Sequence, residues 1–154
     1  MYSKLDVFCK EDGKEVDFYQ NDYHPGGNSY YKENEEINPG TVDFFNESHR
    51  RTLKTITINT AVKTNGFPIP DLIKMDVQGA EMDVLQGASD VLPYVKHVIL
   101  ELQRVEYNKG APLREIVIEY MDSIGFDCKM QFSENGQNGP DGDYHFINRN
   151  PIAK

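Results

Sequence analysis

Residues 72–102 constrain the fold most, because they have the pattern of a buried strand, a tight turn, a helix and a second strand. The run Leu72-Ile-Lys-Met-Asp-Val77 is short and nearly continuously apolar, which is typical of a buried parallel strand rather than of an alternating edge strand. Apolar residues then recur on one helical face between positions 82 and 91, and Pro93 ends that helix. Residues 95–102 form the second apolar run, and a helical crossover makes the two strands parallel.

The C-terminal third predicts one more helix and an antiparallel hairpin. Apolar residues recur at helical spacing over 113–124, with a proline before them and a glycine after them. Residues 126–132 and 143–147 alternate between apolar and polar side chains on either side of a loop rich in Gly, Asn and Pro. Together with the 72–102 unit, this pattern predicts an α/β fold with parallel strands and a closing antiparallel hairpin.

The N-terminal third has a different character. Leu5–Cys9 and Val16–Tyr19 are two β-prone runs around the turn signal Glu11-Asp-Gly-Lys14, so we expect a small hairpin there. Residues 20–51 are rich in Asn, Tyr, Gly and Glu and predict a long polar loop. Long loops in compact domains are usually functional, so we expect this one to face a ligand. The length of 154 residues predicts a single domain.

Charge and cysteine usage narrow the classes of function. Lys and Arg number 16 against 25 Asp and Glu, a net charge of −9, which argues against nucleic acid and anionic membranes as partners. Cys9 and Cys128 are far apart with no metal-binding spacing, so we expect two reduced core thiols and no metal site. No run of about 20 apolar residues predicts a membrane span, and the cytoplasm is the default location.

Polar side chains stand where the two predicted parallel strands end. Ligands of open parallel sheets bind outside the carboxyl ends of the strands. Asp76, Gln78, Glu81 and Glu101 lie at these positions and predict a site with two carboxylates facing one crevice. The same residues also suit a structural interpretation, in which Glu81 is only an acid at a helix start and Glu101 a solvated strand end.

The run from Leu72 to Ala88 resembles the hallmark of FkbM-type methyltransferases, whose pattern is roughly K-[IM]-D-x-[EQ]-G-x-E-x-x-[VI]-L-x-G. Two further segments are similar to the family, namely Pro25–Tyr30 with its serine and Thr57-Ile-Asn59, where the family usually has Thr-Leu-Asp. The resemblance implies the Rossmann-like sheet of class I methyltransferases with its final antiparallel hairpin. It also implies transfer of a methyl group from S-adenosylmethionine to a hydroxyl of a sugar or natural product.

The resemblance implies roles for individual residues. Asp76 and Glu101 would be catalytic, and Asp76, Gln78 and Glu81 would bind the cofactor. From the polar loop, we expect His24, Asn28 and Ser29 to bind a small-molecule or glycan acceptor, with His24 as a reserve base.

The sequence departs from the family in one major respect. The glycine-rich donor loop D-x-G-x-x-x-G and the acidic residue that ends the family's second strand are both missing from this sequence. We therefore expect a truncated sheet, with an exposed flank on the strand ending at Asp76 that favours self-association or a partner chain. Two alternatives stay open: a non-catalytic binding or assembly module, and a magnesium-dependent nuclease using Asp76, Glu101 and Gln103, which the net charge disfavours.

Overall fold

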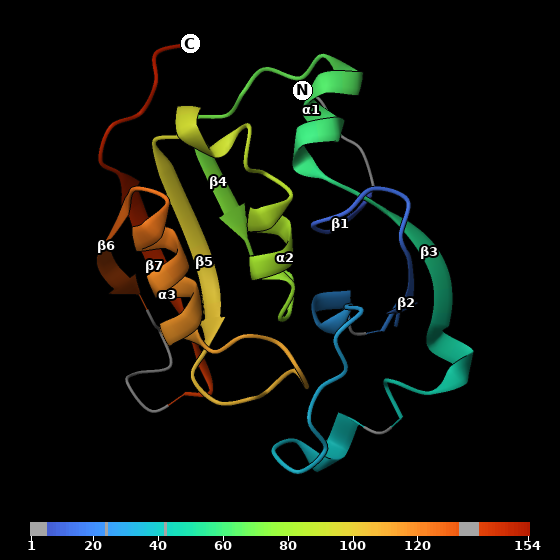
Figure 1. The fold of residues 1–154 in the computed structure, drawn as a ribbon. Coiled ribbons are helices and arrows are strands. Elements are labelled where there is room, and N and C mark those ends of the chain that lie inside the picture. The colour runs from blue at the N-terminus through green and yellow to red at the C-terminus, as the bar shows by residue number, and fades with distance from the viewer. Residues whose placement is uncertain (1–5, 24, 42, 133–138) are drawn as a thin grey trace.

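The computed structural model describes residues 6–23, 25–41, 43–132 and 139–154. The described chain has an α/β fold with two mixed sheets (Figure 1). One sheet has three strands in the order β1-β3-β2, and the other has four in the order β4-β5-β7-β6. The strands and helices are β1 (Val7–Phe8), β2 (Glu15–Tyr19), β3 (Arg50–Ile56), α1 (Ile58–Asn65), β4 (Leu72–Met75), α2 (Glu81–Gln86), β5 (His97–Gln103), α3 (Arg114–Ser123), β6 (Phe126–Phe132) and β7 (Asp141–Asn148).

The four-stranded sheet confirms the predicted crossover and hairpin. β4 and β5 are parallel, with Leu72 opposite His97 and Met75 opposite Leu100. β7 is antiparallel to both β5 and β6. The prediction of a fully buried strand at 72–77 is wrong, because β4 has a strand neighbour on one side only among the described residues. Leu72 is accordingly 51% exposed.

The core of the molecule lies between this sheet and the helices α2 and α3 (Figure 1). Alternate residues of β5, namely Val98, Leu100 and Leu102, are buried. They pack in one cluster with Leu85 of α2 and with apolar residues of α3. The helices therefore hold β5 in place, and with it the polar residues on the opposite face of that strand.

Helix α2 is shorter than the predicted helix over 82–91. It ends at Gln86, and residues 87–91 form tight turns that still bury Ala88 and Val91. The backbone of another segment approaches closely at this helix end, because a Cβ built on Gly87 would collide with the carbonyl oxygen of Cys9. Gly87 thus lets the end of β1 pack against the end of α2, a contact that helical periodicity does not reveal.

The predicted hairpin of residues 5–9 and 16–19 is wrong. β1 and β2 do not pair with each other; β3 lies between them, parallel to β1 and antiparallel to β2. The expected turn is present, but its Asp12 carboxylate accepts hydrogen bonds from the Thr57 amide (2.7 Å) and the Thr60 hydroxyl (2.7 Å). These contacts hold the turn against the start of α1. The sequence patterns predicted neither α1 nor β3.

Residues 20–49 connect β2 to β3 as a long segment that, within the described residues, has only three short 3₁₀ turns, at 25–27, 39–41 and 47–49. It is anchored to the four-stranded half of the molecule. The hydroxyls of Tyr30 and Tyr31 both donate to Asp83 of α2 (3.2 and 3.1 Å), and the Asn34 amide donates to the Tyr107 carbonyl (2.6 Å). Where the sequence predicts a polar loop over 20–51, the structure thus has an irregular segment that packs on α2 and ends at residue 49, because residues 50 and 51 belong to β3.

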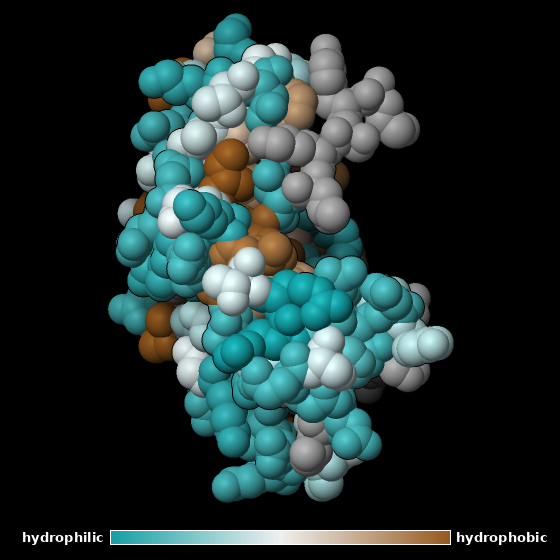
Figure 2. Space-filling model, turned by 90° about the vertical axis from the view of Figure 1, so that its right-hand side faces the viewer, coloured by the Kyte–Doolittle hydropathy of each residue, from teal (hydrophilic) through white to brown (hydrophobic). Residues whose placement is uncertain are grey.

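The surface is mostly polar. Figure 2 shows the side of the molecule that carries β2 and β3, where an apolar patch lies among hydrophilic residues.

Both cysteines are free; Cys9 is buried as expected, whereas Cys128 is exposed, so the prediction of a core thiol is wrong for Cys128. No helix in the described part of the chain has the length and apolarity needed to cross a membrane.

Candidate active site at the ends of β4 and β5

The structure brings together three of the predicted site residues, Asp76, Gln78 and Glu101. Asp76 directly follows β4, and Glu101 lies near the carboxyl end of the parallel neighbour β5. The Gln78 side-chain amide lies between them and donates to Asp76 Oδ1 (3.0 Å) and to Glu101 Oε2 (3.2 Å). Two carboxylates thus share one amide donor at the edge of the sheet where ligands of such folds bind.

The turn between β4 and α2 has an unusual backbone. Gln78 has φ 51°, and it is the one non-glycine residue with positive φ among those described. Gly79 follows with φ 95°, and a Cβ there would lie 2.8 Å from the Cβ of Ala111 and 2.9 Å from that of Asn108. The turn is therefore pressed against the loop after β5, and only glycine fits at position 79.

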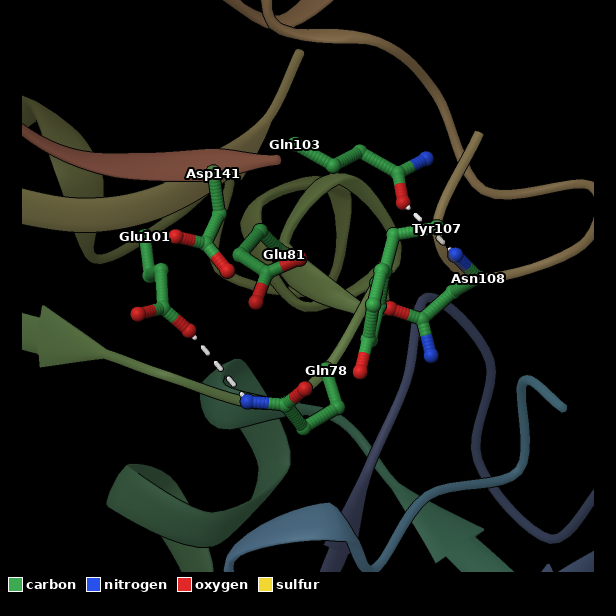
Figure 3. A pocket seen from close by; sticks show the side chains of 8 residues that line it. Gln78, Glu81, Glu101, Gln103, Tyr107, Asn108 and Asp141 are labelled. Carbon is green, nitrogen blue, oxygen red and sulfur yellow. Dashed lines mark hydrogen bonds between the residues drawn. The ribbon is translucent and has the colours of Figure 1, made fainter. Parts of the chain in front are cut away.

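Glu81 is the first residue of α2 and is buried, with 5% of its surface exposed. Its Oε1 accepts a hydrogen bond from the Val77 amide (3.0 Å), so the carboxylate closes the turn from the inside. Burial raises the pKa of Glu81, and the hydrogen bonds from backbone amides oppose that rise. Figure 3 shows the side chain between those of Gln78 and Asp141.

The electrostatics centre on Glu101. Burial raises the pKa of Glu101 to about 8, and the hydrogen bond to Asp76 and the charges of Asp76, Asp141 and Asp143 add to the rise. Burial also raises the pKa of Asp141, against the charge of Arg104. Asp76 forms an ion pair with Lys74, with 3.9 Å between Asp76 Oδ2 and Lys74 Nζ, and both side chains are about half exposed. The Glu101 carboxyl therefore keeps its proton to a higher pH than an exposed glutamate, beside the Asp76 carboxylate.

The predicted acceptor residues approach the same turn from the polar segment. Ser29 is 2% exposed, and its hydroxyl donates to the Gln78 carbonyl (2.9 Å) and accepts from the Tyr31 amide (3.0 Å). Asn28 accepts from the Asn21 amide (2.7 Å). Asn28, Ser29 and Asp76 line one hollow of about 160 Å³. His24 lies outside the described residues.

Sequence reasoning missed most of the residues that surround the carboxylate pair. A small hollow of about 20 Å³ beside Gln78 and Glu101 is also lined by Tyr107, Asn108 and Asp141 (Figure 3). Asn108 is held by Gln103, whose Oε1 accepts from the Asn108 amide (2.9 Å). Gln103 follows Glu101 by two residues on one face of β5, and the sequence analysis named it only as part of the nuclease alternative. Tyr107 and Asp141 come from loops and strand ends for which no local pattern exists.

Two further findings describe what the site contains. In the described ranges, no group of three or more His, Cys, Asp or Glu side chains is arranged to hold a metal ion. The site instead consists of carboxylates, amides and one phenol. Such groups can bind hydroxyls by hydrogen bonds and a cation by charge, and a carboxylate with a raised pKa can accept a proton.

One family model matches most of the chain, and one curated protein matches a third of it. The family model described as the methyltransferase FkbM domain matches residues 2–128, which include Asp76, Gln78, Glu81 and Glu101. The hexuronic acid methyltransferase AglP of Haloferax volcanii is 39% identical over 51 residues, which are 33% of this chain and 21% of that protein. This chain thus aligns with about a fifth of the length of that curated relative. No solved structure matches. Because the family model covers the strand–turn–helix unit and both carboxylates of the pair, the chain belongs to the FkbM methyltransferase domain family.

Proposed function

We propose that this chain serves S-adenosylmethionine-dependent methyl transfer to a hydroxyl oxygen of a sugar or natural product. Membership of the FkbM family supports methyl transfer in general. A relative named as a hexuronic acid methyltransferase supports a sugar as the class of acceptor. The observation that carries the proposal is the pair of Asp76 and Glu101 at the carboxyl ends of β4 and β5, bridged by Gln78.

The pair suits the proton chemistry of this reaction. A hydroxyl must lose its proton as its oxygen becomes methylated, and a general base works best when its pKa lies near the operating pH. Glu101, with its pKa raised to about 8, meets that condition, and we assign it as the base. S-adenosylmethionine, when bound, supplies an electrophilic methyl group on a positively charged sulfur. Asp76 and Glu81 would attract that charge, and Gln78 would orient the pair.

The described residues fit such a donor in charge but not in enclosed volume. Ligand sites that bury a molecule of this size have volumes of about 300–1,000 Å³. The hollow at the carboxylate pair measures about 20 Å³, and its neighbour at Asp76 about 160 Å³. We therefore propose that further walls of the donor pocket come from polypeptide outside the described residues.

The free edge of β4 is the place where we propose that this polypeptide binds. Within the described residues β4 pairs with β5 alone, so one side of its backbone is available for hydrogen bonds. A hollow of about 390 Å³ runs along this edge, with Phe8, Ile58, Ile73 and Val84 in its lining. An apolar strand edge of this kind favours an added strand. A second copy of the chain or a partner chain that completes the sheet would supply it.

Activity assays with a matched control test the proposal. The chain would be incubated with S-adenosylmethionine carrying a labelled methyl group and with a panel of sugars and sugar acids. Transfer by the wild type that falls at least 100-fold in Glu101→Gln would support it, since general bases contribute about 10²–10⁴-fold. Glu119→Gln, which changes an exposed glutamate on α3, should keep full activity.

A non-catalytic binding or assembly module is the second candidate, and the small volume of the hollow at the carboxylate pair favours it. In that case the chain would bind a hydroxylated ligand, and no acceptor would become methylated. The labelled-methyl assay separates the two candidates, because binding of a sugar without transfer by the wild type supports the module alone.

A further inference from the structure

We propose that Gln78 is a positioning residue, which holds the Asp76 and Glu101 carboxylates in one arrangement and is itself held by Ser29 of the polar segment. The catalytic consequence of this inference rests on the proposed function, whereas the arrangement itself can be tested without any methyl transfer.

The first observation is the bridging amide. One NH₂ group of Gln78 donates to both carboxylates, at 3.0 and 3.2 Å, and so uses both of its N–H bonds. Two carboxylates this close repel each other unless a proton or a donor lies between them. The other charges that face Glu101 are the acids Asp141 and Asp143. The nearby cations act elsewhere, because Lys74 contacts Asp76 and Arg104 acts on Asp141.

The second observation is the backbone of Gln78. Its φ of 51° lies in the left-handed region, which residues other than glycine, asparagine and aspartate rarely adopt. Such a conformation persists only where the surroundings enforce it, and it occurs often at functional sites. The conformation turns the side chain toward Glu101 on the neighbouring strand (Figure 3).

The third observation identifies what enforces that backbone. The buried Ser29 hydroxyl donates to the Gln78 carbonyl (2.9 Å), and the close contact of Gly79 with Asn108 and Ala111 fixes the next residue. Ser29 is therefore placed to set the orientation of the Gln78 peptide. Through this hydrogen bond, the polar segment that we expect to face the acceptor is joined to the carboxylate pair.

The test is a pH titration of the Glu101 carboxyl by carbon-13 NMR, with the signal assigned from the Glu101→Gln spectrum. Gln78→Ala and Gln78→Gly both remove the amide, and glycine accepts the left-handed backbone, so at least one variant stays folded. Without its N–H donor, ionised Glu101 loses a stabilising hydrogen bond while Asp76 stays beside it. We expect its acid dissociation constant to fall about tenfold, which is one pKa unit.

Two further variants complete the design. Ser29→Ala should shift Glu101 in the same direction by a smaller factor, because it releases the Gln78 peptide but keeps the amide. Gln20→Ala is the matched control, since Gln20 donates to Asp22 on the exposed surface in a similar way, and it should leave Glu101 unchanged. A dissociation constant of Glu101 that is unchanged or higher in both Gln78 variants would overturn the inference, even if methyl transfer were lost in them. Failure of the wild type to methylate any acceptor would instead count against the proposed function alone.

Discussion

Replacing Gly79 by alanine should destabilise the fold far more than the same change at Gly110. Both glycines have positive φ, 95° and 79°, so alanine costs about 1–2 kcal/mol of backbone strain at either position. At Gly110 an added Cβ meets nothing within 4 Å. At Gly79 it would lie 2.8 Å from Ala111 and 2.9 Å from Asn108, which is too close for real Cβ atoms.

The difference between the two variants measures how tightly the turn is pressed against the loop after β5. Overpacking in a close-packed region costs about 1–3 kcal/mol. We therefore expect a loss of about 2–5 kcal/mol for Gly79→Ala, from the sum of the two effects, and of about 1–2 kcal/mol for Gly110→Ala, from backbone strain alone. The contact partners at Gly79 are the Cβ atoms of Asn108 and Ala111. The backbone of both residues is held by Gln103, which accepts from the Asn108 amide (2.9 Å) and donates to the Ala111 carbonyl (2.7 Å), so they cannot move away without losing these bonds.

Urea unfolding followed by circular dichroism measures both variants under one condition. With a slope of about 2 kcal/mol/M, the midpoint should fall by about 1–2.5 M for Gly79→Ala and by about 0.5–1 M for Gly110→Ala. Equal midpoints for the two variants, at unchanged slope, would refute the reasoning, because the turn would then have room for a side chain.

Three more changes probe the same structure. Glu101→Gln should stabilise the protein at pH 8 and above by about 2 kcal/mol, a value halved for the partial exposure of the side chain. Because the folded pKa of Glu101 is raised from 4.5 to about 8, the wild type loses stability as pH rises from 4.5 through 8, and thermal melts of both proteins from pH 5 to 9 should diverge over that window. Ser29→Ala should cost about 2 kcal/mol by urea unfolding, since the partly buried Gln78 carbonyl and Tyr31 amide each lose a partner; a cost below 0.5 kcal/mol would contradict those contacts. Thr57→Ala removes the side-chain cap of α1 and should lower the free energy of unfolding by about 1 kcal/mol in the same assay. An unchanged midpoint would contradict a stabilising role of this cap.

The part of the fold that the sequence predicted is the part with local periodicity. Two apolar strands, a connecting helix, the helix at 114–123 and the closing hairpin all have side-chain patterns that repeat within a few residues. The site followed from the same patterns, because Asp76 comes directly after β4 and Glu101 lies near the end of its parallel neighbour β5, so the two must lie close together.

The errors share a different physical origin, since each depends on a contact between residues far apart in the chain. β3 separates β1 from β2 because a strand from residues 50–56 pairs with both. The end of α2 packs against the Cys9 carbonyl at Gly87, a contact between residues 78 positions apart. The long-range hydrogen bond from Ser29 to Gln78 spans 49 residues, and no local pattern announces it.

Calorimetric titration of the chain with S-adenosylhomocysteine, run beside light scattering for its mass, tests the central claim most directly. We expect S-adenosylhomocysteine to bind with micromolar strength to an assembly larger than one chain, because the described residues alone do not enclose the donor. In the same titration with S-adenosylmethionine, whose sulfur is positively charged, we expect Asp76→Asn to weaken binding at least tenfold and Glu119→Gln to leave it unchanged. No binding by a folded chain, whatever its mass, would contradict methyl transfer by this chain alone or with its own copies, and would leave a partner-dependent enzyme or the non-catalytic module.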